Sequence, residues 1–563
     1  MERPLTFPPA TAQRPELVFA GICCLLFVSL GLLVLPYPGI QNDEALFAAP
    51  LYHPYIWYAK IAIFHHNFPT MLTSYLGTLK TWIYFVLFRI WTPSVLSIRL
   101  PVLLTGAATI WLSFLLMCRL SGGRSALAAA AFLATDVTFL FTTCFDWGPV
   151  ALQHLLLVSS VLLLVKFHQD GGKRTLGLGF FLFGLGLWDK ALFLWPLAGL
   201  GVATLVVYPR ELVQYLRLRI AVPALICLAA GAFPLLVYNL KSRGNTIAAN
   251  AVFAPDAIAP KFAELRNTLN GSALLGYMTG EDWMEHPRLP KTAIERFSFW
   301  VHEKSGDHRA GLNWPSFLLA LLLVPLLWRT PARRPLLFVL LFLAVTWFQM
   351  ALTADAGLGV HHIALLWPFP FFFIAMAFAE ASRPLKRFGK LALALTVAII
   401  AGQNLLVYNQ HLEQLIRDGG HGSWTDAIFP LSDRLHRYNT SKIYIIDWGM
   451  FNSLRLLNQG GLDLKETWDL LNRSEPDQAG LKTILSEISN PDHVFVGHTA
   501  ELEEFKGVSD HLSRSARSAG YEPVHLETVC DGNGRPVFEI FRFRELGRRV
   551  IPYAVHDHRA ISR

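Results

Sequence analysis

The chain has 563 residues, of which 53% are hydrophobic and 16% are charged, and its formal net charge is +8. Soluble globular proteins carry about 25% charged residues, so this composition excludes a disordered chain, a collagen and an ordinary soluble enzyme. The apolar residues form long blocks with basic residues in the short loops between them. This pattern is typical of a polytopic membrane protein and argues against nucleic acid as a partner.

Eleven apolar blocks are candidates for membrane spans, each of which needs roughly 20 apolar residues. They cover residues 17–36, 97–118, 125–144, 148–168, 175–189, 191–208, 220–239, 314–328, 335–352, 361–380 and 388–409. We expect the first block to be a retained anchor, because its apolar run is longer than that of a signal peptide and no Ala-x-Ala site follows closely. The six cysteines show neither a disulfide framework nor metal-finger spacing.

The basic residues predict the orientation of these spans. With the N-terminus inside, every cytoplasmic loop contains Lys or Arg, and the tail after Tyr408 lies outside. Counting residues 78–91 as a further span would move Arg119 and Arg124 outside and break the alternation. That stretch is short and has charged residues near both ends, so it predicts an interfacial or re-entrant helix.

Two of the expected outer loops are long, at residues 37–96 and 240–313. The first is too apolar for a free loop and too often interrupted by proline for a span, so it predicts short helices lying in the interface. The second is polar and predicts a cap or a mobile flap over a cavity.

Most of the unusual charged and histidine residues fall at the outer ends of the expected spans or in outer loops. They are Asp43, Glu44, Lys80, Arg99, Asp146, Asp189, Lys190, Asp355, His361 and His362. A charge at membrane depth costs a few kcal/mol unless it is paired or lines a wet cavity, so the set predicts one polar cavity open to the outside. Asp136 lies in mid-span, and we expect it to pair structurally with another helix.

From about residue 410 the composition becomes that of a soluble domain. Residues 442–448 and 492–498 predict buried strands, and residues 523–543 predict a hairpin whose turn is 531–534. The sequence thus predicts a transmembrane domain over 1–409 and a small extracytoplasmic α/β domain over 410–563. No catalytic cluster or glycine-rich phosphate loop is recognisable in the second domain, so we expect it to position the acceptor or stabilise the complex and to do no chemistry.

The order of the outer motifs resembles that of a known family. The motifs are the Asp43-Glu44 pair, Lys80 before an aromatic helix, Arg99-Leu100-Pro101 at the start of a span, and Asp146. Together they resemble the polyprenyl-phosphate-sugar-dependent glycosyltransferases of the protein O-mannosyltransferase and aminoarabinose-transferase type, which belong to the GT-C superfamily. The segment ending in Lys190 is similar to the family's Thr-Lys-Gly segment. The resemblance covers residues 15–200 best.

The resemblance implies a fold and an activity. It implies a helical GT-C membrane protein that transfers a sugar from a polyprenyl-phosphate carrier to a protein, lipid or glycan outside the cytoplasm, with inversion. Two departures, Lys80-Thr81-Trp82 for Lys-Pro-Pro and Asp146-Trp147-Gly148 for Asp-Ala-Pro, leave the sugar and the acceptor open. We expect a bacterial inner-membrane enzyme, with the endoplasmic reticulum as the alternative.

The family pattern also assigns roles to individual residues. Asp43 matches the general base, with Glu44 orienting partners and Asp146 as the second candidate for the base. Lys80, Lys190 and Arg99 are the expected phosphate ligands. We expect His361 or His362 to contact phosphate or acceptor, and we expect no cofactor and no metal.

Each role has an alternative. Asp43 could cap the helix that follows, Arg99 could anchor its span at the interface, and His361 and His362 could bind a divalent metal with Asp355. The rival functions are an oligosaccharide transferase that uses a lipid-pyrophosphate donor and a metal, a lipid or solute transporter, and a receptor.

Overall fold

The computed structural model divides the chain into two compact units. The helical unit comprises Met1–Leu35, Pro54–Leu275 and Thr292–Glu413, and the sheet unit comprises Pro36–His53, Gly276–Lys291 and Gln414–Arg563. Within them, the structure describes residues 12–52, 58–63, 65–280, 287–354, 356–438, 440–472 and 478–547. The C-terminal stretch of the sheet unit therefore begins at Gln414, four residues after the expected domain start at 410, and the unit also includes parts of both expected outer loops.

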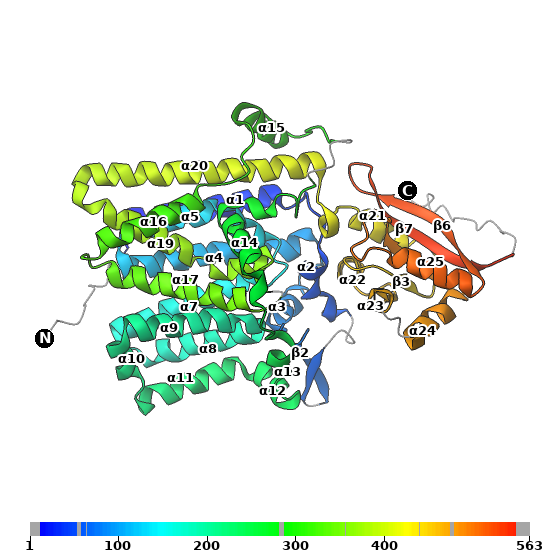
Figure 1. Ribbon diagram of the computed structural model, residues 1–563, viewed down its shortest axis with the longest axis horizontal. Helices are drawn as coiled ribbons and strands as arrows, with labels where there is room; N and C mark the ends of the chain where they lie inside the picture. The colour runs from blue at the N-terminus through cyan, green and yellow to red at the C-terminus, as the bar shows by residue number, and fades with distance from the viewer. Residues whose placement is uncertain are drawn as a thin grey trace. The chain divides into compact units, whose positions relative to one another are not determined.

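Helices that run side by side make up most of the helical unit (Figure 1). They are α1 (Arg14–Val34), α4 (Val95–Ser121), α5 (Gly123–Thr135), α6 (Val137–Cys144), α7 (Val150–Asp170), α8 (Lys173–Asp189), α9 (Leu194–Val207), α11 (Leu218–Gly231), α12 (Phe233–Lys241), α16 (Asn313–Leu327), α17 (Arg333–Leu352), α19 (Phe369–Ala381) and α20 (Lys386–Asp418). Further helices connect or cover them: α3 (Leu79–Leu87), α10 (Pro209–Tyr215), α13 (Asn245–Asn250), α14 (Ile258–Asn270), α15 (Ala293–Ser305) and α18 (Val360–Ile363).

All eleven expected spans coincide with helical segments, but several of these segments are short helices or pairs of helices joined at a bend. Within the described residues, five segments are long and apolar enough to cross a membrane, or up to eight if each bent helix pair is one span. One of the five, Phe369–Asp418, contains two of the expected spans. At 17 and 15 residues, α8 and α16 are shorter than a typical span. The several apolar spans are confirmed, and the number eleven stays a prediction.

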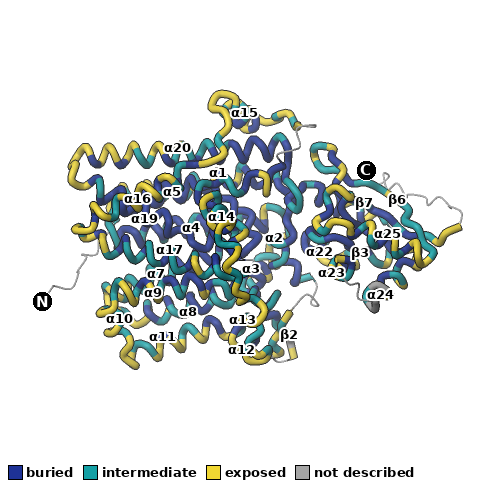
Figure 2. The backbone as a smooth tube through the Cα atoms, viewed as in Figure 1, coloured by how far each residue is buried: buried dark blue, intermediate teal, exposed yellow. Residues whose placement is uncertain are grey.

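Several helices expose apolar side chains along one face. Phe388, Leu391, Leu395 and Ile399 of α20 are each more than half exposed, and Figure 2 shows exposed positions recurring along this helix. Water would disfavour such a surface, whereas lipid tails favour it. The helical unit is therefore that of an integral membrane protein.

Asp136 produces the bend between α5 and α6. Its Oδ1 accepts the backbone N–H of Phe139 at 2.7 Å and the Nε1–H of Trp367 at 2.9 Å, and its Oδ2 accepts Nδ2–H of Asn313 at 2.9 Å. These bonds cap α6 and tie it to two other segments, while the axes of α5 and α6 meet at 58°. Asp136 thus has the structural role that its mid-span position predicts.

The first outer segment contains a feature that the sequence analysis does not predict. Strands β1 (Ala59–Ile63) and β2 (His66–Met71) form an antiparallel hairpin where interfacial helices alone are expected. The β-branched residues Ile61 and Ile63 suit a strand, but the segment does not alternate between apolar and polar residues, so its sequence does not distinguish it from its surroundings. Helix α3 follows and has nine residues, so it is about 14 Å long and too short to span.

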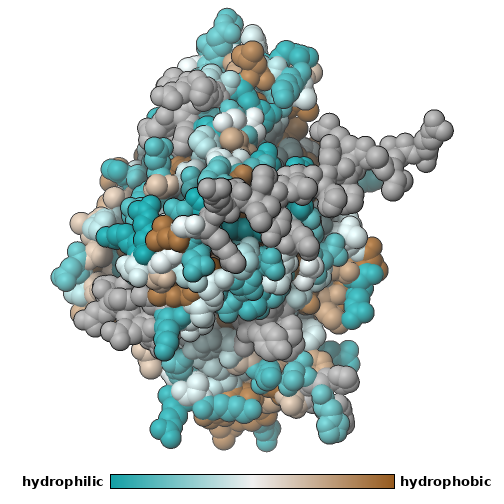
Figure 3. Space-filling view, turned by 90° about the vertical axis from the view of Figure 1, so that its right-hand side faces the viewer, coloured by the Kyte–Doolittle hydropathy of each residue, from teal (hydrophilic) through white to brown (hydrophobic). Residues whose placement is uncertain are grey.

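The sheet unit has a five-stranded sheet in the order β4-β3-β5-β7-β6. Its strands are β3 (Ile443–Ile445), β4 (Leu464–Glu466), β5 (Val494–His498), β6 (Tyr521–Cys530) and β7 (Pro536–Glu545). Strands β4, β3 and β5 pair in parallel. Helix α21 (Ile428–Leu435) precedes β3 in the chain, and the helices that follow β3 are α22 (Phe451–Leu457), α23 (Trp468–Leu471), α24 (Gln478–Ile488) and α25 (Val508–Ser518). The expected α/β domain and its terminal hairpin are confirmed, and only β4 is unpredicted. Figure 3 shows a face of the molecule on which hydrophilic side chains are widespread and hydrophobic ones form smaller, scattered groups.

Close helix packing in the helical unit depends on two facing glycines. A Cβ on Gly184 of α8 would collide with the carbonyl oxygen of Leu228, and one on Gly231 of α11 would collide with that of Phe181. The two backbones therefore touch, as small residues allow in membrane helices.

This packing predicts that Gly231→Ala destabilises the protein by about 1–3 kcal/mol, because the added methyl group must push α8 and α11 apart. Gly201→Ala in α9 is the matched control, since its Cβ would meet nothing within 4 Å and alanine favours a helix. Thermal unfolding of the purified protein in detergent measures both variants. Equal melting temperatures would contradict the close approach.

Candidate functional site

Lys80 and Asp146 form a buried ion pair in the helical unit. The Nζ of Lys80 lies 2.7 Å from Oδ2 of Asp146, and the two side chains are 4% and 1% exposed. The same ammonium donates to the backbone carbonyl of Asp146 at 3.1 Å and lies 5.8 Å from the centre of the Tyr84 ring. The second oxygen of Asp146 accepts the N–H of Ala151 at the start of α7. These contacts therefore fix the positions of both the Lys80 ammonium and the Asp146 carboxylate.

Lys190 binds the same turn from another direction. It follows α8, is 2% exposed, and its Nζ donates to the carbonyl of Gly148 at 3.1 Å. Its backbone also forms a bridge with Leu76, and the neighbouring N–H of Gly77 donates to the carbonyl of Asp189. Residues 72–78 and 188–191 therefore lie side by side, and both ammonium groups converge on residues 146–148.

Asp189 lies beside the two lysines but pairs with an amide. Its Oδ2 accepts the Nε2–H of Gln153 at 2.8 Å, and its Oδ1 has no hydrogen-bond partner within the described part of the chain. It interacts electrostatically with Lys80, Lys190 and Asp146. Gln153 is a polar residue inside an apolar span, a signal that the sequence analysis does not use.

Arg99 is fully buried within α4. Its Nη1 donates to the carbonyl of Leu35 at 2.7 Å, and its guanidinium lies 4.7 Å from the centre of the Phe145 ring. It is therefore packed inside the unit and does not serve as an anchor at a lipid interface, which was the alternative. Phe145 precedes Asp146, so Arg99 approaches the same turn as the two lysines.

The histidine pair also belongs to this region. Nδ1 of His361 lies 3.0 Å from Nε1 of Trp147, which donates to it, and a Cβ on Gly148 would meet the His361 ring at 2.8 Å. The His362 ring is 4.2 Å from that of His361, and its buried Nδ1 has no partner among the described residues. His362 also interacts electrostatically with Lys190 and with Lys261, a fully buried lysine of α14 that the sequence analysis does not single out.

Asp43 and Glu44 belong to the sheet unit and lie in a short helix, α2 (Asn42–Leu46). The side chain of Gln41 caps this helix by accepting the N–H groups of Asp43 and Glu44 at 2.6 and 3.0 Å. The carboxylate of Glu44 is buried and accepts the N–H of Gln41 at 3.3 Å. Gln41 therefore performs the capping role that was the alternative for Asp43, and the partly exposed carboxylate of Asp43 is not the cap.

A metal site does not emerge from these side chains. Within the residues that the structure describes, no group of three or more His, Cys, Asp and Glu is arranged to hold a metal ion. Asp355, the expected third ligand beside the two histidines, lies outside the described residues.

The sheet unit contains one buried acid–histidine pair that the sequence analysis does not predict. Oδ2 of Asp447, just after β3, lies 2.7 Å from Nδ1 of His498 at the end of β5. Asp447 also accepts the backbone N–H groups of Glu504 and Phe505. The pair thus fixes the loop that follows β5.

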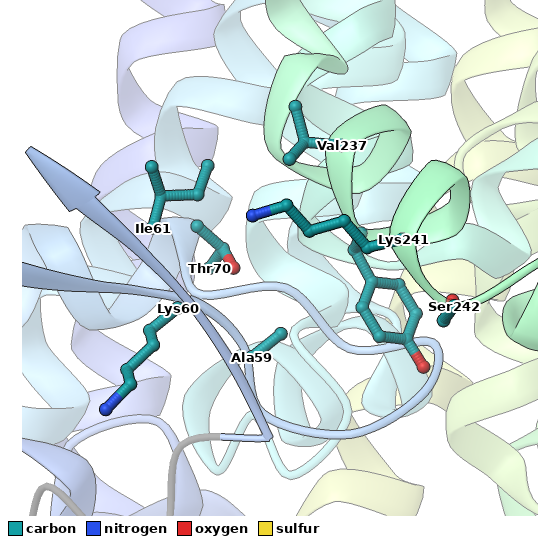
Figure 4. Close-up of a pocket in the computed structure, with 8 residues that line it drawn as sticks. Ala59, Lys60, Ile61, Thr70, Val237, Lys241 and Ser242 are labelled. Carbon is teal, nitrogen blue, oxygen red and sulfur yellow. The ribbon is translucent and has the colours of Figure 1, made fainter.

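A small cavity of about 210 Å³ lies apart from the lysine cluster, between the β1–β2 hairpin and α12. Figure 4 shows the Lys241 side chain extending over it toward Thr70 and Ile61, while Lys60 points away. Both lysines are exposed, and none of the predicted site residues lines this cavity.

The buried pair predicts an asymmetry in stability. Lys80→Met leaves the Asp146 carboxylate buried without its counter-ion, so unfolding should become easier by about 3–5 kcal/mol. The double variant Lys80→Met/Asp146→Leu removes both charges and should recover most of that loss. Thermal or denaturant unfolding in detergent measures the cycle. A double variant as unstable as the single one would show that the charges are not coupled.

The geometry can now be compared with known proteins. No protein-family model and no curated protein matches the sequence. Two similar solved structures are those of ArnT from Cupriavidus metallidurans, bound to undecaprenyl phosphate (12% identity, TM-score 0.56, covering 94% of this chain and 98% of that one) and in the apo state (13%, 0.54, 93% and 97%). An apo oligosaccharyltransferase from Archaeoglobus fulgidus has a TM-score of 0.47 at 12% identity, covering 86% and 69%. The nearly complete overlap with both ArnT structures shows that this chain shares their overall fold.

Proposed function

We propose that this protein transfers a sugar from a polyprenyl-phosphate carrier to an acceptor on the extracytoplasmic side of the membrane. The observation that carries the proposal is the convergence of two buried ammonium groups, those of Lys80 and Lys190, on residues 146–148. The full-length fold similarity to ArnT, which was solved with undecaprenyl phosphate bound, supports a lipid phosphate as the ligand.

The charge of the cluster suits a phosphate. Lys80, Lys190 and Arg99 bring three cations to the turn, where Asp146 pairs with Lys80 and Asp189 lies beside the lysines. When the glycosidic bond breaks, negative charge develops on the lipid phosphate that leaves, and fixed cations at low dielectric stabilise that charge without reorganising.

Asp146 is better suited to hold Lys80 than to take a proton. One of its oxygens binds the ammonium and the other accepts the N–H of Ala151, and the side chain is almost completely buried. A general base needs an oxygen within reach of the acceptor. Asp43 is partly exposed and does not serve as a helix cap, so it is the stronger candidate for the base.

The reaction then follows from these roles. The acceptor O–H or N–H gives its proton to Asp43 as the acceptor atom attacks the anomeric carbon from the face opposite the phosphate. The bond from that carbon to the phosphate oxygen breaks, and its electron pair stays on the lipid phosphate beside the cations. In-line displacement inverts the anomeric centre. The acceptor, whether protein, lipid or glycan, and the identity of the sugar are left open by this chemistry.

The phosphate assignment predicts weaker donor binding in Lys190→Met, which keeps the length of the side chain and removes its charge. Loss of one charge-assisted contact costs about 1.5–3 kcal/mol, which is about a ten- to hundredfold rise in Kd for undecaprenyl phosphate in nanodiscs. Lys173→Met, at the exposed opposite end of α8, is the matched control. Unchanged affinity in Lys190→Met would exclude Lys190 as a phosphate ligand.

The base assignment predicts that Asp43→Asn lowers turnover by about 10²- to 10⁴-fold, because the amide cannot accept the proton. Affinity for undecaprenyl phosphate and the melting temperature should stay close to wild type, since Gln41 provides the cap. Asp492→Asn, at an exposed site of the sheet unit, is the control. An Asp43→Asn variant that keeps more than about a third of the turnover would transfer the base role to Asp146, because a true base contributes far more.

A further inference from the structure

The short outer segment that carries Asp43 is part of the sheet unit, although about 360 residues separate it from the C-terminal stretch of that unit, which begins at Gln414. Residues 36–53 cluster with 276–291 and with the chain from Gln414 onward. The contacts between them are specific, and they converge on the residues next to Asp43.

Asn42 makes the central contact. It is 4% exposed, and its Oδ1 accepts the backbone N–H of Asn452 at 2.9 Å. That N–H lies in the first turn of α22, where an amide has no acceptor within its own helix. The other end of the same side chain, Nδ2, donates to Oδ1 of Asp43 at 3.4 Å. One amide group thus connects the C-terminal domain to the Asp43 carboxylate.

Gly39 makes a second contact, through the backbone. Its N–H donates to the carbonyl of Trp424 at 2.7 Å, and Trp424 is almost completely buried. A Cβ on Gly39 would collide with the carbonyl oxygen of Thr425. The two segments of the chain approach each other so closely at this point that only glycine fits.

A third contact holds the far end of the segment. Gly460 has a φ of +75°, and a Cβ there would come within 2.8 Å of the carbonyl oxygen of Tyr52. The segment is therefore fixed to the C-terminal domain before, beside and after Asp43, while Gln41 fixes the local helix.

We propose that the C-terminal part of the sheet unit, from Gln414 onward, anchors the catalytic base, with Asn42 and Gly39 as positioning residues for Asp43. This inference rests on the proposed function, in which Asp43 takes the acceptor proton. It gives the C-terminal domain a part in catalysis although none of its side chains takes part in the chemistry. A base displaced by even 1 Å loses much of its effect.

The test uses the full-length protein with Asn42→Ala. We expect kcat to fall about ten- to a hundredfold, with little change in KM for the lipid donor, because the phosphate ligands belong to the helical unit. Hydrogen exchange followed by mass spectrometry should show faster exchange in residues 36–48 and unchanged protection in β3 and β5. Gly39→Ala should do the same by steric displacement.

Two further variants separate positioning from general damage. Asn42→Asp keeps an acceptor for the Asn452 N–H, so it should restore protection of residues 36–48. Asn472→Ala, at an exposed asparagine in the same unit, should match wild type in kcat and in exchange. Wild-type exchange and kcat in Asn42→Ala would overturn the inference. So would a fall in kcat that accompanies loss of protection throughout the sheet unit.

The outcomes also distinguish this inference from the proposed function. If the wild-type protein transfers sugar and Asp43→Asn is inactive, yet Asn42→Ala is fully active, only the anchoring role fails. If the wild-type protein neither binds undecaprenyl phosphate nor transfers sugar, the proposed function fails. The hydrogen-exchange experiment then still decides whether the chain from Gln414 onward holds residues 36–48 in place.

Discussion

Burial of positive charge in an apolar helix bundle is the constraint on which the site depends. Lys80 and Lys190 lie where water cannot solvate them fully, so each needs a fixed partner. Both find one in residues 146–148, through a carboxylate and two backbone carbonyls. The turn between α6 and α7 therefore fixes both cations. Its position follows in turn from the break at Asp136, which redirects the chain into α6.

Much of this region could be predicted from the sequence because hydropathy and charge are global signals. A charged residue at the end of an apolar block is costly unless it is paired or hydrated, so several such residues at one side of the membrane predict a shared cluster. Lys80, Asp146, Lys190 and the histidine pair do come together. The strands around 443–445 and 494–498 were predictable for a similar reason, since a short apolar run bounded by turn residues is typical of a buried strand.

Other features depend on contacts that no local pattern encodes. The cap of α2 is Gln41, because its longer side chain folds back onto two N–H groups, whereas the usual preference points to the aspartate. Gln153 and Lys261 are recognised only through their partners in three dimensions, Asp189 and the last turn of α17. Strand β4 has only three residues, too few for a recognisable pattern, and it is identified as a strand by its pairing with β3.

The hydrogen bond between the Asn42 side chain and the Asn452 backbone has a consequence for how the protein is made. The asparagine and the amide that it binds are 410 residues apart. At 5–20 residues per second, the ribosome needs roughly 20–80 s to reach the second partner after the first has emerged. During that interval the segment with Asp43 has crossed or reached the membrane surface without its anchor. The segment with the proposed base would be fixed only when the last domain folds, so a truncated or stalled chain would contain the proposed phosphate ligands but no anchored Asp43.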